Sequence, residues 1–182
     1  MEEGLFYSSQ IRIKPGLYQV RIATRDRKSG QVGSAQQWIE IPDLALRQLS
    51  LSSLFLGLQN VGLTAAKGEA AGSPQVQFST DHHFARNSRL RFLAFIYNAG
   101  RPSDLKSSPQ IWLQARLLRG GQVVRSTPMQ SVTFESRDFA RIPYGGEISL
   151  DAIPSGEYVL ELTVNDQITK TNASEHTKIT VE

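Results

Sequence analysis

One stretch of this sequence occurs twice at a constant spacing. Residues 16–22 (GLYQVRI) resemble residues 156–162 (GEYVLEL), and the spacing is 156 − 16 = 140 residues. The same spacing relates further pairs on both sides of these runs: Ile13 and Ile153, Asp26 and Asp166, Ser34 and Ser174, Ile39 and Ile179, Ile41 and Val181. An ungapped match of this length indicates one supersecondary unit that is used twice.

The repeated unit has the features of a β-hairpin that closes a β-sandwich. Tyr18, Val20 and Ile22 alternate with polar residues, so one face of the strand is apolar. The preceding Gly suits a tight turn, and a Tyr near the start of such a strand is typical of the tyrosine corner of sandwich folds. The Asp that follows the strand favours a turn, because its side chain can bond to nearby backbone. Two closing hairpins predict two sandwiches in tandem, and only the second has its upstream strands in this sequence.

Period-two alternation continues through the segments between the two copies. It is clear in residues 89–97, 111–119 and 158–164, and shorter versions occur at 148–150 and 179–181. The run 89–97 is apolar on both faces beyond Arg91, so we expect this strand to run through the core. The tetrapeptide 119–122 (RGGQ) predicts a tight hairpin turn. No segment of helical length combines a 3.6-residue period with caps.

We therefore predict an all-β chain, an immunoglobulin-like or fibronectin-III-like β-sandwich preceded by the closing strands of a second, truncated sandwich. Pro42 ends strand pairing, so the predicted domains are residues 1–43 and 44–182. Long loops are expected at Asn60–Pro74 and Asn98–Pro109, which are rich in Gly, Ala, Pro and Ser.

The net charge of +3 is unevenly distributed along the chain. Residues 44–141 carry 12 − 5 = +7, whereas residues 142–182 carry 2 − 7 = −5. A basic stripe can attract nucleic acid, but these Arg residues are spread over separate strands. We expect them to pair across strands with Glu147, Glu157 and Glu161, and we predict no nucleic-acid partner.

Cysteine and long apolar segments are both absent from the sequence. No cysteine means no disulfide framework and no thiolate chemistry, although it leaves the redox compartment open. The apolar runs are too short to span a bilayer, so we predict no membrane insertion. The acidic start, Met1 to Gly4, is unlike a secretory signal, so an exported natural protein would be represented here by an excised piece.

Several short motifs, in this order and spacing, resemble a known family. They are residues 30–35 (GQVGSA), 39–44 (IEIPDL), 49–52 (LSLS), Phe84 before Leu90, 97–99 (YNA), 117–121 (LLRGG) and 154–158 (PSGEY) leading to Asp166. Together they resemble the C-terminal region of the von Willebrand factor A-related (VWFA-related) proteins of acidobacteria. The resemblance implies an exported protein, periplasmic or secreted, in which β-rich modules follow an N-terminal von Willebrand A domain. The metal site of A domains needs an Asp-x-Ser-x-Ser run, which this sequence lacks, so no metal site is carried over.

The strongest candidate for chemistry is the cluster Asp81-His82-His83, with His176 as the remaining histidine. Adjacent side chains on a strand point to opposite faces, so His82 and His83 could share a metal only from a loop. The ligand count is poor, and a solvated polar turn is the simpler interpretation. The sequence has neither a Gly-x-Ser-x-Gly elbow nor a phosphate-binding Gly loop before a helix. We predict that the protein is not an enzyme and needs no cofactor or metal.

Aromatic and basic side chains give a candidate ligand or partner surface: Trp112, Tyr97, Tyr144, Arg89 and Arg91. Trp112 is out of phase with the apolar face of its strand, so it either is exposed or covers a loop. Stacking on sugar rings would use such residues, together with Trp38, although they more often complete a core or an interface. The leading hypothesis is a non-catalytic module that acts as a spacer or binds protein, and the alternative is a carbohydrate-binding module.

The strands expected in residues 5–41 need a partner that covers their apolar face and open edges. About three strands are expected there, too few to bury both faces of a sandwich. We expect this segment to dock on the second domain or to pair with a second copy of the chain as a homodimer.

Overall fold

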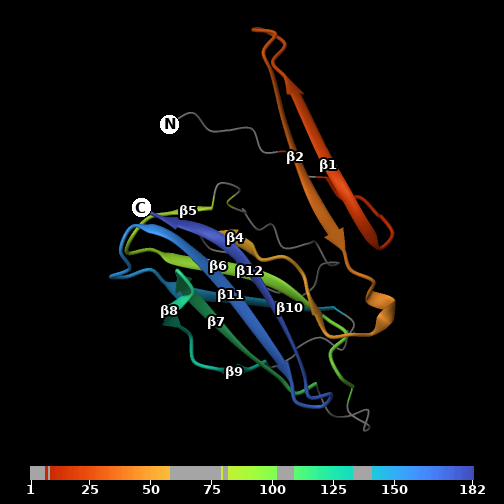
Figure 1. Cartoon of the computed structure of the whole chain (residues 1–182), viewed down its shortest axis with the longest axis vertical. Coiled ribbons are helices and arrows are strands. Elements are labelled where there is room, and N and C mark those ends of the chain that lie inside the picture. Colours follow the sequence, from red (N-terminus) through yellow and green to blue (C-terminus); the bar gives the residue numbers. More distant parts are fainter. Residues whose placement is uncertain (1–6, 8, 58–78, 80–81, 102–108, 133–140) are drawn as a thin grey trace, which may run out of the picture. The chain divides into compact units, whose positions relative to one another are not determined.

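The computed structural model of the chain describes residues 7, 9–57, 79, 82–101, 109–132 and 141–182. The elements in chain order are β1 (Gly16–Arg25), β2 (Val32–Ile41), the 3₁₀ turn η1 (Leu44–Leu46), β3 (Ser50–Leu51), β4 (Phe55–Gly57), β5 (His83–Phe84), β6 (Arg89–Tyr97), β7 (Ile111–Arg119), β8 (Gln122–Ser126), β9 (Gln130–Ser131), β10 (Arg141–Ser149), β11 (Gly156–Asp166) and β12 (Thr171–Val181) (Figure 1). The chain is all-β, as predicted. No helix in the described residues is long and apolar enough to cross a membrane.

The chain forms two compact units, Met1–Leu46 and Arg47–Glu182. The junction between them follows η1 and lies three residues beyond the boundary expected at residue 43. Within the described part of the first unit, the only strands are β1 and β2, so the expectation of about three strands before residue 42 is wrong. Ile11 and Ile13 lie outside any strand and are 75% and 43% exposed, because nothing holds this segment in a ladder.

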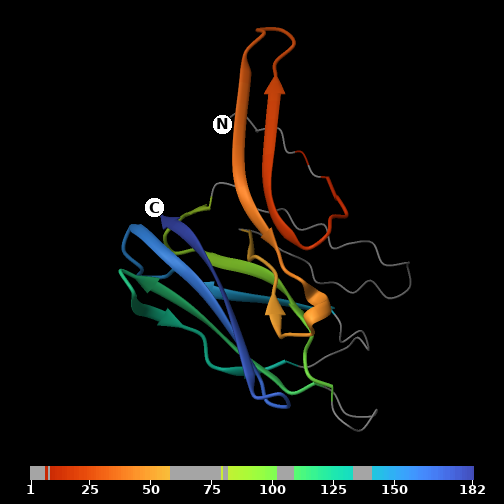
Figure 2. The same ribbon diagram turned by 45° about the vertical axis from the view of Figure 1, so that its right-hand side comes forward.

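The second unit is a sandwich of two sheets (Figure 2). One sheet has the order β10-β6-β3, with β4 also paired to β6. The other has the order β5-β12-β11-β7-β8, with β9 also paired to β7. The row β12-β11-β7-β8 matches the order G, F, C and C′ of immunoglobulin-like domains, and the row β10-β6-β3 matches E, B and A. The β-sandwich predicted from the sequence is therefore confirmed.

Alternating residues of both sheets meet in one core. Leu90, Phe92, Ala94 and Ile96 of β6 belong to it, and all are at most 4% exposed. From the facing sheet come Ile111, Leu113, Ala115 and Leu117 of β7, Tyr158, Leu160, Leu162 and Val164 of β11, and Ile179 and Val181 of β12. Leu93 is also buried, at 4%, but lies on the other face of β6 and outside this core. The predicted two-sided burial of this strand is thus confirmed.

The first unit repeats the closing hairpin of the sandwich in register. β1 pairs with β2 from Gly16↔Ile41 to Arg25↔Val32, and β11 pairs with β12 from Gly156↔Val181 through Asn165↔Asn172. Each pair in the second hairpin is the corresponding pair of the first plus 140 residues. The repeat read from the sequence is therefore a repeat of structure.

The two hairpins also share their local hydrogen bonds. The Tyr18 hydroxyl donates to the Lys14 carbonyl at 2.9 Å, and the Tyr158 hydroxyl donates to the Pro154 carbonyl at 2.6 Å. In both, this bond spans four residues back along the chain, as in a tyrosine corner. Each strand begins with a Gly of positive φ, +147° at Gly16 and +145° at Gly156, which a residue with a Cβ rarely adopts.

Candidate interaction surfaces

The outer face of the sheet that contains β7, β11 and β12 presents polar side chains in rows. Cross-strand register places Trp112 beside Asn165 and Asn165 beside Asn172. The next rows are Gln114, Thr163 and Ser174, and then Arg116, Glu161 and His176. Trp112 is 40% exposed, which confirms the exposed alternative, and it is flanked by amides. We call the residues of the first two rows the Trp112 face.

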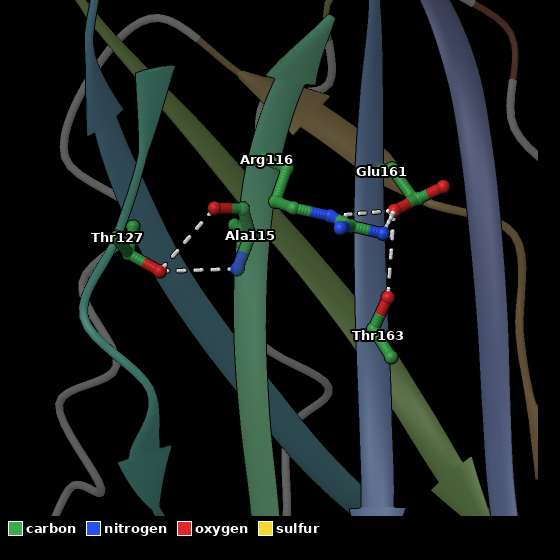
Figure 3. A network of polar contacts seen from close by, with 5 residues as sticks. All are labelled: Ala115, Arg116, Thr127, Glu161 and Thr163. Atoms are coloured by element: carbon green, nitrogen blue, oxygen red, sulfur yellow. Dashed lines mark hydrogen bonds and ion pairs between the residues drawn. The ribbon is translucent and has the colours of Figure 1, made fainter. Parts of the chain in front are cut away.

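A network of polar contacts fixes the third row (Figure 3). The Arg116 Nε donates to Glu161 Oε1 at 2.8 Å, and its Nη2 forms an ion pair with the same oxygen. The Thr163 hydroxyl reaches that oxygen at 3.5 Å. On the other side of β7, the Ala115 amide donates to the Thr127 hydroxyl at 3.0 Å, which attaches the segment after β8. The charges of Arg116 and Glu161 are paired with each other, so this row connects β7 to β11.

The outer face of the β6–β10 sheet is a second surface. Arg89 and Arg91 both form ion pairs with Glu147 across the β6–β10 ladder, as expected from the sequence. Beyond them, the Arg141 guanidinium lies 3.9 Å from the Phe95 ring centroid, in cation–π range. Tyr97 is half-buried at the end of β6 and is paired with Arg141 and Ser50.

Tyr144 lies on the opposite face of β10 from Glu147. Its ring centroid is 6.1 Å from that of Phe92, a core residue, and Tyr144 packs against the core. Burial raises the pKa of the Tyr144 hydroxyl. Most of this ring therefore serves packing, and little of it is presented to a ligand.

The five residues predicted as one surface are thus divided among three places. Trp112 belongs to one sheet, whereas Arg89, Arg91 and Tyr97 belong to the outer face of the other, and Tyr144 faces inward. Arg89 and Arg91 are engaged with Glu147. Of the five, only Trp112 lies on an exposed polar face suited to stacking.

The histidines take up separate structural contacts. His82 Nδ1 lies 3.0 Å from the Lys178 carbonyl oxygen, and His83 Nδ1 lies 2.5 Å from Glu182 Oε1. His176 is on the outer face of β12, in the row of Arg116. Asp81 lies outside the described residues. No group of three or more potential metal ligands is found within the described residues.

Asp166 at the end of β11 was not predicted as a long-range contact, yet among the described residues it is the buried polar one, at 1% exposure. It accepts a hydrogen bond from the Gly100 amide at 2.5 Å and one from the Ile168 amide at 2.8 Å. A Cβ at Gly100 would come within 2.8 Å of Asp166 Oδ2. Asp166 therefore joins the segment after β6 to the closing hairpin. The carboxylate of Asp26, its counterpart, accepts local hydrogen bonds from the Lys28 amide and the Ser29 hydroxyl.

The β1–β2 hairpin exposes apolar side chains to an unusual degree. The larger ones are Leu17 at 67%, Val20 at 40%, Ile22 at 57%, Val32 at 70% and Trp38 at 61%. In the sandwich, the residues equivalent to Val20 and Ile22 are Leu160 and Leu162, both 0% exposed. The sequence pointed to this apolar face through its alternation, and the structure leaves it exposed.

The second unit belongs to the class of immunoglobulin-like or fibronectin-III-like β-sandwiches and has a tyrosine corner, by strand order and local geometry. No protein-family model matches the chain, and no curated protein matches it. Among solved structures, the chain is similar to the CARDB domain of the PF1109 protein from Pyrococcus furiosus, crystallised in complex with di-metal ions. That similarity has 9% identity and a TM-score of 0.32, and it covers 74% of this chain and 88% of that one. A TM-score of this size adds no argument to the fold described above.

Proposed function

We propose that the chain is a non-catalytic β-sandwich module of an exported bacterial protein, periplasmic or secreted, that acts as a spacer or binds another protein. The observation that carries the proposal is the repeated closing hairpin, built twice with one register and one tyrosine corner. Repeated sandwich units are suited to arrays, in which each unit contributes length or a contact surface. The motifs that resemble VWFA-related proteins of acidobacteria support the same setting.

A substrate panel tests the non-catalytic part of this proposal. The intact chain is incubated with ester, glycoside, phosphate and peptide substrates, and we expect no turnover above buffer. The control is the pair of variants His82→Ala and His83→Ala. Turnover by the intact chain that either variant abolishes would contradict the proposal.

The Trp112 face supports a second candidate, a carbohydrate-binding module. An exposed indole beside amides and hydroxyls matches the needs of a sugar, which stacks on an aromatic ring and bonds through its hydroxyls. Binding to a polysaccharide panel tests it, with Trp112→Ala as the variant and Trp38→Ala as the matched control. Loss of binding in Trp112→Ala alone would favour this function. A panel without binding, or equal loss in both variants, would count against it.

A further inference from the structure

β1 and β11 are equivalent strands with different surroundings. β11 pairs on one side with β12 and on the other with β7, antiparallel, from Val159↔Leu118 to Asp166↔Ile111. β1 pairs with β2, and within the part of the chain that the structure describes, no other strand pairs with it. The edge of β1 that corresponds to the β7 side of β11 is therefore open in the described structure.

The direction of the backbone amides at this edge follows from two backbone hydrogen bonds. The Asp26 amide donates to the Gln31 carbonyl within the first hairpin, so even-numbered residues of β1 bond to β2. The Gln167 amide donates to the Gln110 carbonyl, so odd-numbered residues of β11 bond toward β7. Both agree with the 140-residue spacing. Consequently Gln19, Arg21 and Ala23 direct their amides and carbonyls to the open edge of β1.

The charges at this edge define what would bind there. In the sandwich, Glu161 of β11 pairs with Arg116 of β7. The residue equivalent to Glu161 in β1 is Arg21, so the charge is inverted. A strand added at β1 in the register of β7 therefore needs a carboxylate opposite Arg21, and a second Arg there would be repelled.

The end of the strand suggests a further requirement. The guanidinium of Arg119, the last residue of β7, lies 5.5 Å from the Tyr158 ring centroid, and its Nη1 is 3.4 Å from the Tyr158 hydroxyl. Tyr18 has the same corner geometry, but no cation among the described residues lies over its ring. A partner strand with a basic residue at its C-terminal end would complete the Tyr18 corner as Arg119 completes that of Tyr158.

We propose that the open edge of β1 binds an extended peptide strand of a partner protein, antiparallel to β1, by β-strand addition. The strand carries alternating apolar residues that extend the face of Val20 and Ile22, a carboxylate opposite Arg21 and a basic residue near Tyr18. Backbone bonds supply affinity in this mode of recognition, and the alternate side chains supply specificity. This inference rests on the protein-binding role proposed above.

Two peptides test it on the intact chain. Each copies residues 110–119, one unchanged and the other with Arg116→Glu. We expect the wild-type chain to bind the Arg116→Glu peptide about fivefold more tightly by fluorescence anisotropy, since a cross-strand charge pair contributes a fraction of a kcal/mol to about 1 kcal/mol. Arg21→Glu should reverse the preference. Equal binding of both peptides by both proteins, or no binding of either, would overturn the proposal.

A pair of proline variants locates the bound strand. Ala23→Pro removes an amide at the open edge of β1 and leaves every β1–β2 bond in place, so the hairpin should persist and peptide binding should be lost. Gln36→Pro removes an amide at the outer edge of β2, away from β1. This variant should bind the peptide as the wild type does. Unchanged binding by Ala23→Pro would overturn the proposal. A dimer of the chain that Ala23→Pro converts to monomers would place a second copy at this edge and would also overturn it. A negative result in these tests would not affect the proposal that the module is non-catalytic. Only the substrate panel tests that proposal.

Discussion

The two tyrosine corners allow the same side chain to be compared in two surroundings. Tyr158 is 2% exposed, and its hydroxyl bonds to the Pro154 carbonyl, whereas Tyr18 lies in a hairpin whose neighbours are mostly exposed. We expect Tyr158→Phe to lower the free energy of unfolding by about 1 kcal/mol, because a buried tyrosine loses its hydrogen bond to the backbone. Tyr18→Phe should lower it by less. Chemical denaturation of both variants measures the difference, and equal effects would contradict the expectation.

Gly146 lies opposite the ring of a core residue. A Cβ at this position would come within 2.6 Å of Phe92 Cζ, and Phe92 is a core residue that is 4% exposed. We expect Gly146→Ala to destabilise the fold by about 1–3 kcal/mol through overpacking. Gly33→Ala is the matched control, since its Cβ would meet only the Thr24 hydroxyl at 3.5 Å. Thermal unfolding followed by circular dichroism distinguishes the two, and equal shifts would argue against overpacking.

Glu175 on β12 makes stability depend on pH. Its strand partner is Leu162, a core residue, and burial raises the pKa of the Glu175 carboxyl above its ordinary value. The folded state therefore binds a proton more tightly than the unfolded state, and stability falls as pH rises through the window between the two pKa values. We expect Glu175→Gln to be slightly more stable than wild type at about pH 7 and equal to it at about pH 3, since the partial exposure of this carboxyl weakens the effect. Denaturation at the two pH values checks this, and a gain confined to the acidic value would contradict it.

At the scale of the elements, local patterning predicted most of the strands. Alternation identified β1, β6, β7 and β11, and the 140-residue repeat predicted that β1–β2 and β11–β12 are equivalent. Alternation and the repeat are both visible in the residues of the strands themselves. They can therefore be recognised without knowing which strands become neighbours in the sheets.

The candidate surface was harder to predict, because it depends on which sheet each strand joins. Trp112 and Tyr97 are on strands of similar pattern, yet β7 and β6 belong to different sheets. The run Pro143 to Gly146 has no clear alternation, so nothing in it indicated that Tyr144 faces Phe92. The contact of Asp166 with Gly100 spans 66 residues and follows only from the complete topology.

The ion pair between Arg116 and Glu161 connects two central strands and can be measured as a coupling. The Arg116 side chain is 38% exposed and that of Glu161 is 24% exposed, so solvent screens the pair in part. We expect a double-mutant cycle of Arg116→Ala and Glu161→Ala to give a coupling of about 0.5–1 kcal/mol. The coupling should decrease in high salt. A coupling near zero in low salt would mean that the contact contributes nothing to stability.

At the scale of the whole molecule, the two units should differ in protection from hydrogen exchange. Ile22 and Leu162 are equivalent residues, and the Leu162 side chain is fully buried while that of Ile22 is 57% exposed. An isolated two-stranded hairpin is marginally stable in water, so its amides open locally. We expect the Ile22 amide to exchange much faster than the Leu162 amide. Addition of the Arg116→Glu peptide should slow exchange in β1 and leave β11 unchanged.

The identical register of the two hairpins also affects how the chain folds. Each hairpin is local in sequence and can form early, whereas β7 must find its neighbour across a longer loop. The β1–β2 and β11–β12 hairpins have the same register, so either could in principle pair with the same edge of β7. Arg21 would meet Arg116 in the wrong pairing, while Glu161 meets it in the right one. We therefore expect the inverted charge to favour pairing of β7 with β11 over β1, and we expect Arg21→Glu to remove that preference.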